Sequence, residues 1–365
     1  MLTTIVIRSK DEADRLRLAL ASLAGQAALG EVVVVDDGSS DRTPQVIAEA
    51  ASSLPLRVVS HRVARGRSAA ANAGARAARG DVLVFLDGDT LAGPGLVARH
   101  AALHAARPDC VGRGETFHLR CTRFLLDPEC ATPRPGEEER LARLASEERE
   151  RLKVTLAQVR HDFTSIERRA TPGIYPGSAP RLLCELEMEA LREHPDCSVL
   201  WAAASGCNWS VRRSDFLGAG GFDEMLDINE HRELALRLCQ RGAKMAAVDG
   251  ACSYHLTHRS GWRDPLQDTR WESAFYAAHP RPVVKLLAVF WASLSPDYAI
   301  PADARITSLP ALEEAASRYG SGIDYDAIRR SVLSLPELAT SAVDKIADGS
   351  RARPSAPSIA TTNSA

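Results

Sequence analysis

Apolar positions repeat with two different periods over the first ninety residues. Short runs of valine, isoleucine and leucine, typical of buried strands, alternate with segments whose apolar positions recur every three or four residues, as on helices. Strands are predicted at residues 4–8, 31–35, 57–60 and 82–86, and helices at 14–23, 44–51 and 68–78. This alternation predicts right-handed βαβ units and a parallel sheet covered on both faces.

The regular alternation ends near residue 108. Residues 137–153 have the pattern of one charged amphipathic helix. Residues 171–180 contain three prolines and two glycines, which predicts a loop. A helix is predicted over residues 230–240, with Gly242 as its left-handed cap.

Two carboxylates follow the predicted strand at residues 82–86, where Asp87 and Asp89 flank Gly88. The carboxyl end of a buried parallel strand lies at the crevice where α/β sheets bind ligands. Carboxylate oxygens suit a hard divalent cation that is also held by phosphate oxygens. The alternative is a strand-ending turn in which Asp and Gly serve turn geometry alone.

Two common nucleotide-binding motifs are absent from the sequence. The turn after the first strand, residues 8–12, contains no glycine, so the dinucleotide fingerprint Gly-x-Gly-x-x-Gly is not there. No P-loop occurs at any position. An NAD enzyme and a P-loop nucleotidase are therefore disfavoured.

Composition narrows the class of protein further. The 365 residues are 45% hydrophobic and 25% charged with a net charge of -2, which is ordinary for a globular chain and gives no basic footprint for nucleic acid. The eight cysteines form no Cys-x-x-Cys pair, so a reducing cytoplasm is the expected setting, and structural zinc is not expected. The apolar stretch at residues 283–294 is too short to span a membrane. A buried helix is expected there, although peripheral membrane contact stays open.

Five motifs occur in an order that resembles the family 2 glycosyltransferases. They are residues 32–43, 66–74, 78–89, 220–224 and 230–237. The resemblance covers about residues 3–260. It implies an α/β fold of the GT-A type, with a Rossmann-like mixed sheet flanked by helices and followed by a C-terminal helical extension. It also implies inverting transfer of a sugar from a nucleotide-sugar.

The resemblance suggests a division of the chain into four parts. A nucleotide-sugar-binding half would cover residues 1–106. An acceptor and catalytic half would cover 107–260, with a variable helical insertion at about 135–200. A helical extension would follow at 261–349, and residues 350–365, rich in Ser, Ala, Pro and Thr, are expected to be disordered.

The resemblance also assigns residues to the donor and the metal. Asp89 is expected to ligate Mn²⁺ or Mg²⁺ directly, and Asp87 to contact ribose or a metal-bound water. The implied metal group is Asp87, Asp89, His255 and His258. The implied nucleotide-sugar contacts are Arg8, Asp11, Glu12, Asp36, Asp37, Gly66, Arg67, Asn72, Asp87 and Gly88.

Some of these assignments compete with simpler explanations. Asp36 and Asp37 are expected at the nucleobase, but an aspartate there can also cap the next helix through an Asx turn. Many members of the family carry arginine immediately before the asparagine at 72, whereas this chain has Ala71.

The base that takes the acceptor's proton is expected at Glu230 or His231. Relatives commonly have Glu-Asp at this position, with the aspartate as base, and histidine is chemically able to do the same work. A role for His231 in capping the helix is an equal alternative. Asn208 and Trp209 are proposed as an acceptor platform, with a packed core tryptophan as the default reading of Trp209.

The identities of donor and acceptor are only partly constrained. A UDP-sugar is expected ahead of GDP- and dTDP-sugars. A saccharide, a lipid-linked intermediate, a natural product and a peptide all remain open as acceptor. Two other functions stay in view: a catalytically degenerate nucleotide-sugar-binding protein, and a sugar-nucleotide pyrophosphorylase, which would need a glycine-rich, basic first turn that is missing.

Overall fold

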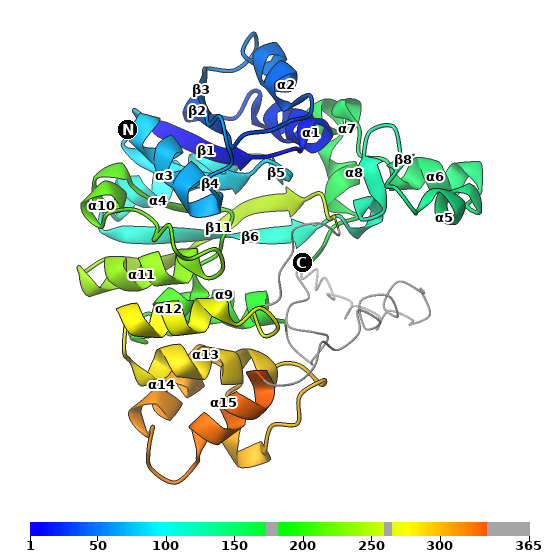
Figure 1. Cartoon of the computed structure of the whole chain (residues 1–365). Helices are drawn as coiled ribbons and strands as arrows, with labels where there is room; N and C mark the ends of the chain where they lie inside the picture. Colours follow the sequence, from blue (N-terminus) through cyan, green and yellow to red (C-terminus); the bar gives the residue numbers. More distant parts are fainter. Residues whose placement is uncertain (173–181, 259–264, 334–365) are drawn as a thin grey trace, which may run out of the picture. The chain divides into compact units, whose positions relative to one another are not determined.

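A mixed β-sheet organises residues 1–333 (Figure 1). The structure is a computed structural model that describes residues 1–172, 182–258 and 265–333. The strands of the large sheet are β1 (Thr3–Ser9), β2 (Leu29–Asp36), β3 (Leu56–Ser60), β4 (Val82–Asp87), β5 (Thr90–Ala92), β6 (Cys110–His118), β9 (Thr171–Pro172), β10 (Trp209–Arg212) and β11 (Lys244–His255). Strands β7 (Leu125–Asp127) and β8 (Thr132–Pro133) pair separately.

The strand order is β3-β2-β1-β4-β10-β6-β11-β5, with β9 paired to β6. Strands β3, β2, β1 and β4 are parallel, as the alternating pattern predicts. Strand β10 runs antiparallel to both β4 and β6, and β5 runs antiparallel to β11. The predicted α/β class with a mixed sheet is therefore confirmed.

Helices cover both faces of the sheet. Alternate side chains of the central strands divide between two cores, because successive residues of a strand point to opposite faces. One face packs against α1 (Ala13–Leu23), α2 (Thr43–Ala50) and α4 (Leu96–Ala106). The other packs against α3 (Arg67–Ala77), α9 (Leu183–Glu193), α10 (Arg213–Gly218) and α11 (Glu230–Gln240).

The C-terminal helices extend the second core. They are α12 (Arg270–Ala278), α13 (Pro282–Ser293), α14 (Leu309–Ser317) and α15 (Tyr325–Leu333), with a short 3₁₀ turn at Ala302–Ala304. Two other 3₁₀ turns lie earlier in the chain, at Arg120–Thr122 and Leu200–Ala203. Figure 1 shows α13, α14 and α15 beyond α9, α11 and α12 on the side away from the sheet. Helix α13 is buried along nearly its whole length, as predicted for residues 283–294. Within the described ranges, no helix combines the length and apolar character needed to cross a membrane.

The predicted helix over residues 137–153 is wrong in one respect, because it is broken into two. Helix α5 (Glu138–Ala142) ends before a new helix, α6 (Ser146–Leu152), begins. The break occurs where the Glu148 carboxylate accepts a hydrogen bond from the Ala145 N–H at 2.9 Å, which starts a second helix. Two further short helices, α7 (Leu156–His161) and α8 (Phe163–Glu167), complete this region.

Two other predictions fall partly or wholly outside the described residues. Of the predicted loop at 171–180, only Thr171–Pro172 is described, and it pairs with β6 as β9. The predicted tail at 350–365 lies outside the described ranges. The predicted cap is confirmed, since α11 ends at Gln240 and Gly242 has φ of 100°.

A chain of hydrogen bonds lies buried between α4 and β10. The His100 ring lies 2.9 Å from Asn208 Oδ1 through Nε2 and 2.8 Å from Ser210 Oγ through Nδ1. His104 Nε2 lies 2.8 Å from the same Ser210 oxygen. Because an amide oxygen only accepts, His100 Nε2 donates and Nδ1 accepts from the hydroxyl, so both rings can be neutral and satisfied. Both histidines are fully buried, and burial lowers the pKa of each to about 4.

This buried pair predicts loss of stability in mild acid. The folded-state pKa of about 4 lies below the unfolded value of ~6.5, so the stabilisation is complete above pH 6.5 and is lost as the pH falls toward 4. Protonating one ring should cost on the order of 3 kcal/mol of unfolding free energy by pH 4. Urea unfolding between pH 7 and 4.5 measures this loss of unfolding free energy. In His104→Gln, which keeps a polar atom near Nε2 but does not titrate, the slope of stability against pH should be shallower. An unchanged slope would contradict the assignment.

Candidate active site

The carboxyl ends of β1, β2 and β4 place acidic and basic side chains along one edge of the sheet. Strand register sets Arg8 of β1 beside Asp87 of β4, and Ser9 of β1 beside Asp36 of β2. Parallel strands present these ends at the same edge, where ligand crevices form in α/β folds. The residues predicted from the strand-ending turns are therefore neighbours.

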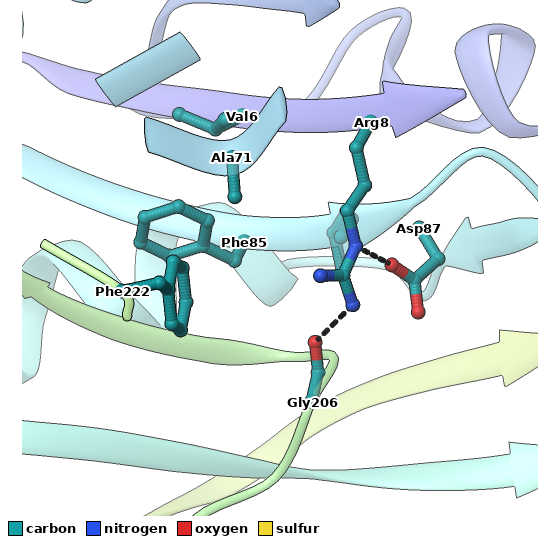
Figure 2. Close-up of a pocket in the computed structure, with 8 residues that line it drawn as sticks. Val6, Arg8, Ala71, Phe85, Asp87, Gly206 and Phe222 are labelled. Atoms are coloured by element: carbon teal, nitrogen blue, oxygen red, sulfur yellow. Dashed lines mark hydrogen bonds and ion pairs between the residues drawn. The ribbon is translucent and has the colours of Figure 1, made fainter. Parts of the chain in front are cut away.

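Arg8 connects three parts of this edge. Its Nε donates to Asp87 Oδ1 at 2.8 Å and its Nη1 to Glu230 Oε1 at 3.2 Å, while Nη2 makes a long contact of 3.5 Å with the Gly206 carbonyl. Figure 2 shows the guanidinium between Asp87 and Gly206. Despite burial, the two carboxylates raise the pKa of Arg8 above its ordinary value, so it remains a cation. Beside it, an apolar recess of about 10 Å³ is lined by Val6, Ala71, Phe85 and Phe222, among others.

Asp89 meets two histidines from the end of β11 and the residues after it. Its Oδ2 lies 3.2 Å from His255 Nε2 and 2.7 Å from His258 Nε2. Pairing of β5 with β11 sets Thr90 beside His255, and the Leu256 N–H donates to the Asp89 carbonyl at 2.8 Å. The predicted grouping of Asp89 with His255 and His258 is therefore reproduced in space.

This triad has the donor set of a divalent metal site. One carboxylate oxygen and two imidazole nitrogens lie within 4.8 Å of one another. Burial opposes ionisation of Asp89, but the charges and hydrogen bonds of His255 and His258 hold its pKa well below the ordinary value. Burial lowers and Asp89 raises the pKa of His255, with a net increase. Mixed oxygen and nitrogen ligands fit Mn²⁺ better than Mg²⁺, which favours oxygen.

Asp87 does not join this group. Its carboxylate instead pairs with Arg8 and stays 32% exposed at the side chain. Asp87, which was named in the predicted metal group, therefore lies outside the triad in this arrangement. The exposed carboxylate is still open to a ligand at the edge of the sheet, as in the expected contact with ribose or a metal-bound water.

Gly88 packs closely against Glu12 and Ser9. A Cβ on Gly88 would come within 2.7 Å of Glu12 Oε2 and 2.9 Å of Ser9 Oγ, so a larger residue does not fit. Both of those oxygens are buried and have no hydrogen-bond partner among the described residues. Burial, then the charges of Asp89 and Asp87, raise the pKa of Glu12 well above its ordinary value. A ligand with a hydrogen-bond donor or a positive charge would therefore be attracted to Glu12.

The Asp36–Asp37 turn is structural in its observed contacts. Asp36 accepts from the Ser39 N–H at 3.0 Å, an Asx-type turn, but it does not cap helix α2 as the alternative supposed. Asp37 accepts from the Arg65 and Gly66 N–H groups, both at 2.9 Å, and contacts His61 Nδ1 at 2.6 Å. These bonds fix the start of α3, where Arg67 is exposed. Asp11 likewise accepts from the Ser40 N–H, at 2.7 Å.

Asn72 does not face the crevice, so its predicted contact with nucleotide is wrong in this structure. The residue is only 3% exposed. Its amide donates to the Phe222 carbonyl at 2.9 Å and accepts from the Phe222 N–H at 2.8 Å. Asn72 therefore holds residues 220–224 against α3 through two hydrogen bonds to the Phe222 backbone, one donated and one accepted.

Asn208 and Trp209 are also buried rather than placed for an acceptor. Trp209 is 2% exposed and stacks on Phe85 with ring centres 4.6 Å apart, so the default reading of a core tryptophan holds. Asn208 is fully buried, and its amide donates to the Glu115 and Ala251 carbonyls. The predicted acceptor platform is wrong because both side chains are used inside the core.

Glu230 and His231 begin α11 beside Arg8. His231 Nδ1 lies 3.6 Å from Glu230 Oε2, and His231 Nε2 lies 2.9 Å from Arg232 Nη1. Burial raises the pKa of Glu230, but His231 and Arg8 outweigh it and lower the pKa to about 2. Burial and Arg232 lower the pKa of His231, against the effect of Glu230.

Sequence reasoning missed the residues that surround these two. Arg232 pairs with the buried Glu187 at 3.0 Å, and Glu187 also pairs with Arg113 at 2.6 Å. His118 packs edge-on against His255, with ring centres 5.2 Å apart. Arg113, Glu187 and His118 lie on elements far from α11 or β5 in sequence, so no local pattern signals them.

Comparisons with known proteins concern the sequence family and the fold. Residues 4–162 match the sequence model of the family described as Glycosyl transferase family 2. The solved structure of S. aureus TarS is 15% identical, with a TM-score of 0.51 over 91% of this chain and 52% of its own. S. aureus TarS 1-349 in complex with UDP-GlcNAc is 15% identical, with a TM-score of 0.50 over 91% of this chain and 79% of its own.

A third structure is a mannosyltransferase, PcManGT from Pyrobaculum calidifontis in complex with GDP-Man and Mn²⁺. It is 15% identical, with a TM-score of 0.47 over 95% of this chain and 81% of its own. No curated protein sequence matches the chain. At these identities the TarS structures establish a shared fold, and this chain spans about half the length of the longer TarS chain.

The triad predicts which aspartate controls metal affinity. Asp89→Asn should weaken Mn²⁺ binding by at least ~10-fold, because it removes the charged member of the group. Titration of free Mn²⁺ by electron paramagnetic resonance measures this directly. Asp87→Asn, two residues away and outside the triad, should weaken binding less. Equal losses of Mn²⁺ affinity in the two variants would show that Asp87 is also a metal ligand.

Proposed function

Because residues 4–162 belong to glycosyl transferase family 2, we propose that this protein is an inverting, metal-dependent glycosyltransferase with a UDP-sugar as donor. The observation that carries the proposal is the Asp89–His255–His258 triad at the carboxyl end of β4, beside the Arg8 bridge to Glu230. The UDP-GlcNAc complex of the similarly folded TarS makes a UDP-sugar the first donor to test.

The triad would hold a divalent cation against the donor diphosphate. Such a cation supplies Lewis-acid stabilisation of the charge that builds on the departing diphosphate. Mn²⁺ suits the two imidazoles best. Glu12, Asp87 and Gly88 would line the donor around it.

Arg8 separates two regions with different tasks. The acidic residues 87–89 lie on its β4 side, and Glu230 with His231 lies on its α11 side. In a single displacement, the acceptor hydroxyl attacks the anomeric carbon as the bond to the diphosphate oxygen breaks, and the acceptor's proton passes to Glu230 or His231. Inversion follows because attacking and leaving oxygens lie on opposite faces of the sugar.

The transferred group is proposed to be a hexose or N-acetylhexosamine. Neither the triad nor the Arg8 bridge selects between them, and the acceptor could be any of the four classes expected from the sequence. Donor identity is therefore the first quantity to determine.

A donor panel tests this function. Release of nucleoside diphosphate and thermal shift are followed with UDP-, GDP- and dTDP-sugars, with and without Mn²⁺. A UDP-sugar should raise the melting temperature of the protein and slowly release UDP. Both effects should require Mn²⁺ and be lost in Asp89→Asn. Glu139→Gln, a surface carboxylate exposed on α5, is the matched control and should behave as wild type.

Two results would change the conclusion. Stabilisation by a nucleotide-sugar without turnover, with every acceptor class tested, would favour a nucleotide-sugar-binding protein. No response to any nucleotide would overturn the donor site itself.

A further inference from the structure

Arg232 determines where His231 carries its proton. The Arg232 Nη1 atom lies 2.9 Å from His231 Nε2. A guanidinium donates hydrogen bonds and has no acceptor atom, so the imidazole nitrogen facing it must present its lone pair. A neutral His231 in this position therefore carries its proton on Nδ1.

Arg232 is held firmly enough to impose this choice. Its Nη2 pairs with Glu187 at 3.0 Å, its Nε donates to the Ala202 carbonyl at 2.8 Å, and Nη1 also donates to Asn229 Oδ1 at 3.0 Å. The guanidinium also lies 5.1 Å from the centre of the Trp291 ring. These partners come from α9, α13, the residue before α11 and the segment before β10, so the guanidinium is fixed from several sides.

Glu187 keeps the guanidinium charged and in place. This carboxylate is 2% exposed and is shared between Arg232 and Arg113. Removing a partner from a buried ion pair leaves an uncompensated charge, which is strongly unfavourable. Any position of the Arg232 guanidinium away from Glu187 would therefore be energetically unfavourable.

The proton on Nδ1 is directed at Glu230. Nδ1 is buried and has no hydrogen-bond partner within the described residues, but Glu230 Oε2 lies 3.6 Å away. Gly206 also lies next to this part of the ring, since a Cβ added there would lie 3.4 Å from Nδ1 and 3.6 Å from Cε1. A small shift of either side chain converts this contact into a hydrogen bond in which His231 donates.

We infer that Arg232 is a positioning residue that holds His231 as the Nδ1–H tautomer, so that His231 orients Glu230 and Glu230 accepts the proton of the acceptor. This inference rests on the proposed function and assigns the base within it. His231 Nε2 is occupied by Arg232 and Nδ1 already carries hydrogen, so neither ring nitrogen can take a proton at neutral pH. Of the two residues at the start of α11, only Glu230 retains a free lone pair toward the site.

The charged groups around the pair agree with this division of roles. Arg8 of β1 faces Glu230, Arg232 faces His231, and Glu187 of α9 neutralises Arg232. Burial and Arg232 lower the pKa of His231, which favours the neutral ring. Glu230 is ionised throughout the physiological range, and its contribution as a base comes from its position more than from its basicity.

The first experiment locates the proton without any substrate. Long-range ¹H–¹⁵N correlation spectra of the imidazole rings distinguish the two tautomers, and His231→Asn assigns the signal. Wild-type His231 should be the Nδ1–H tautomer from pH 6 to 8. Arg232→Met should let the ring titrate in this range, while Arg232→Lys, which keeps a cationic donor, should restore much of the wild-type behaviour. An Nε2–H tautomer in the wild type would overturn the inference even if the Arg232 variants fail to fold.

The second experiment separates the two candidate bases by isosteric replacement. Glu230→Gln keeps the shape but removes the proton acceptor, and should lower kcat by ~100-fold or more. His231→Asn places an amide N–H near the position of Nδ1–H, and should lower kcat by less than ~10-fold. The reverse order, or small effects in both, would overturn the role of Glu230.

The pH profile adds a measurement that a purely structural role would not change. The kcat of the wild-type protein should not follow the titration of a histidine between pH 6 and 8. In Arg232→Met, kcat should change with pH across this range. Donor binding by calorimetry is measured for every variant. Wild-type protein that binds no donor and releases no diphosphate would overturn the proposed function, whereas the tautomer spectra decide the position of the proton independently.

Discussion

The site depends on one buried cation shared by two carboxylates. Arg8 lies in β1, the third strand of the sheet order, and joins Asp87 of β4 to Glu230 of α11. Glu230 is 222 residues away in sequence, so this ion pair brings the second half of the chain to the first. Removal of the guanidinium would leave the buried Glu230 carboxylate without its cationic partner, which typically costs about 3–5 kcal/mol. The same contact aligns the start of α11 with the strand that delivers Asp89.

Charge at this edge is balanced over several elements. The acidic side chains Glu12, Asp87 and Asp89 face the cations Arg8 and Arg15. Arg15 is 5% exposed and donates to four backbone carbonyls: Leu256, Leu126, Leu125 and Thr122. It therefore holds the backbone next to His255 while adding positive charge near Asp89. The remaining negative charge makes the edge suited to a divalent cation.

The sequence carries enough information for the strands and for the acidic turns, but not for the use of each side chain. The valine-rich run before Asp36 and the run before Asp87 predict buried strands, and parallel pairing then brings their ends together. The expected nucleotide contact of Asn72 did not take account of its partner Phe222, which lies 150 positions away, whereas the default of a core tryptophan at 209 agrees with its stacking on Phe85. A polar or aromatic residue near a motif has the same local pattern whether it binds ligand or packs inside.

The buried polar network beneath the site explains why Asn208 is in the core. The pairing of β6 with β11 shifts register between Ala247 and Cys252, which leaves backbone groups there without their regular ladder partners. The Asn208 amide takes up two of them, the Glu115 and Ala251 carbonyls, while His100 holds its oxygen.

Gly114 makes this possible, since a Cβ there would come within 2.5 Å of the Asn208 amide. Beyond the shift, β11 resumes pairing from Cys252 to His255 and brings His255 to Asp89. The buried histidines of the core and His255 of the Asp89 triad are therefore connected through the same part of β11. His100 holds Asn208, and Asn208 holds the irregular segment of β11 through the Ala251 carbonyl. The course of this segment determines where β11 places His255.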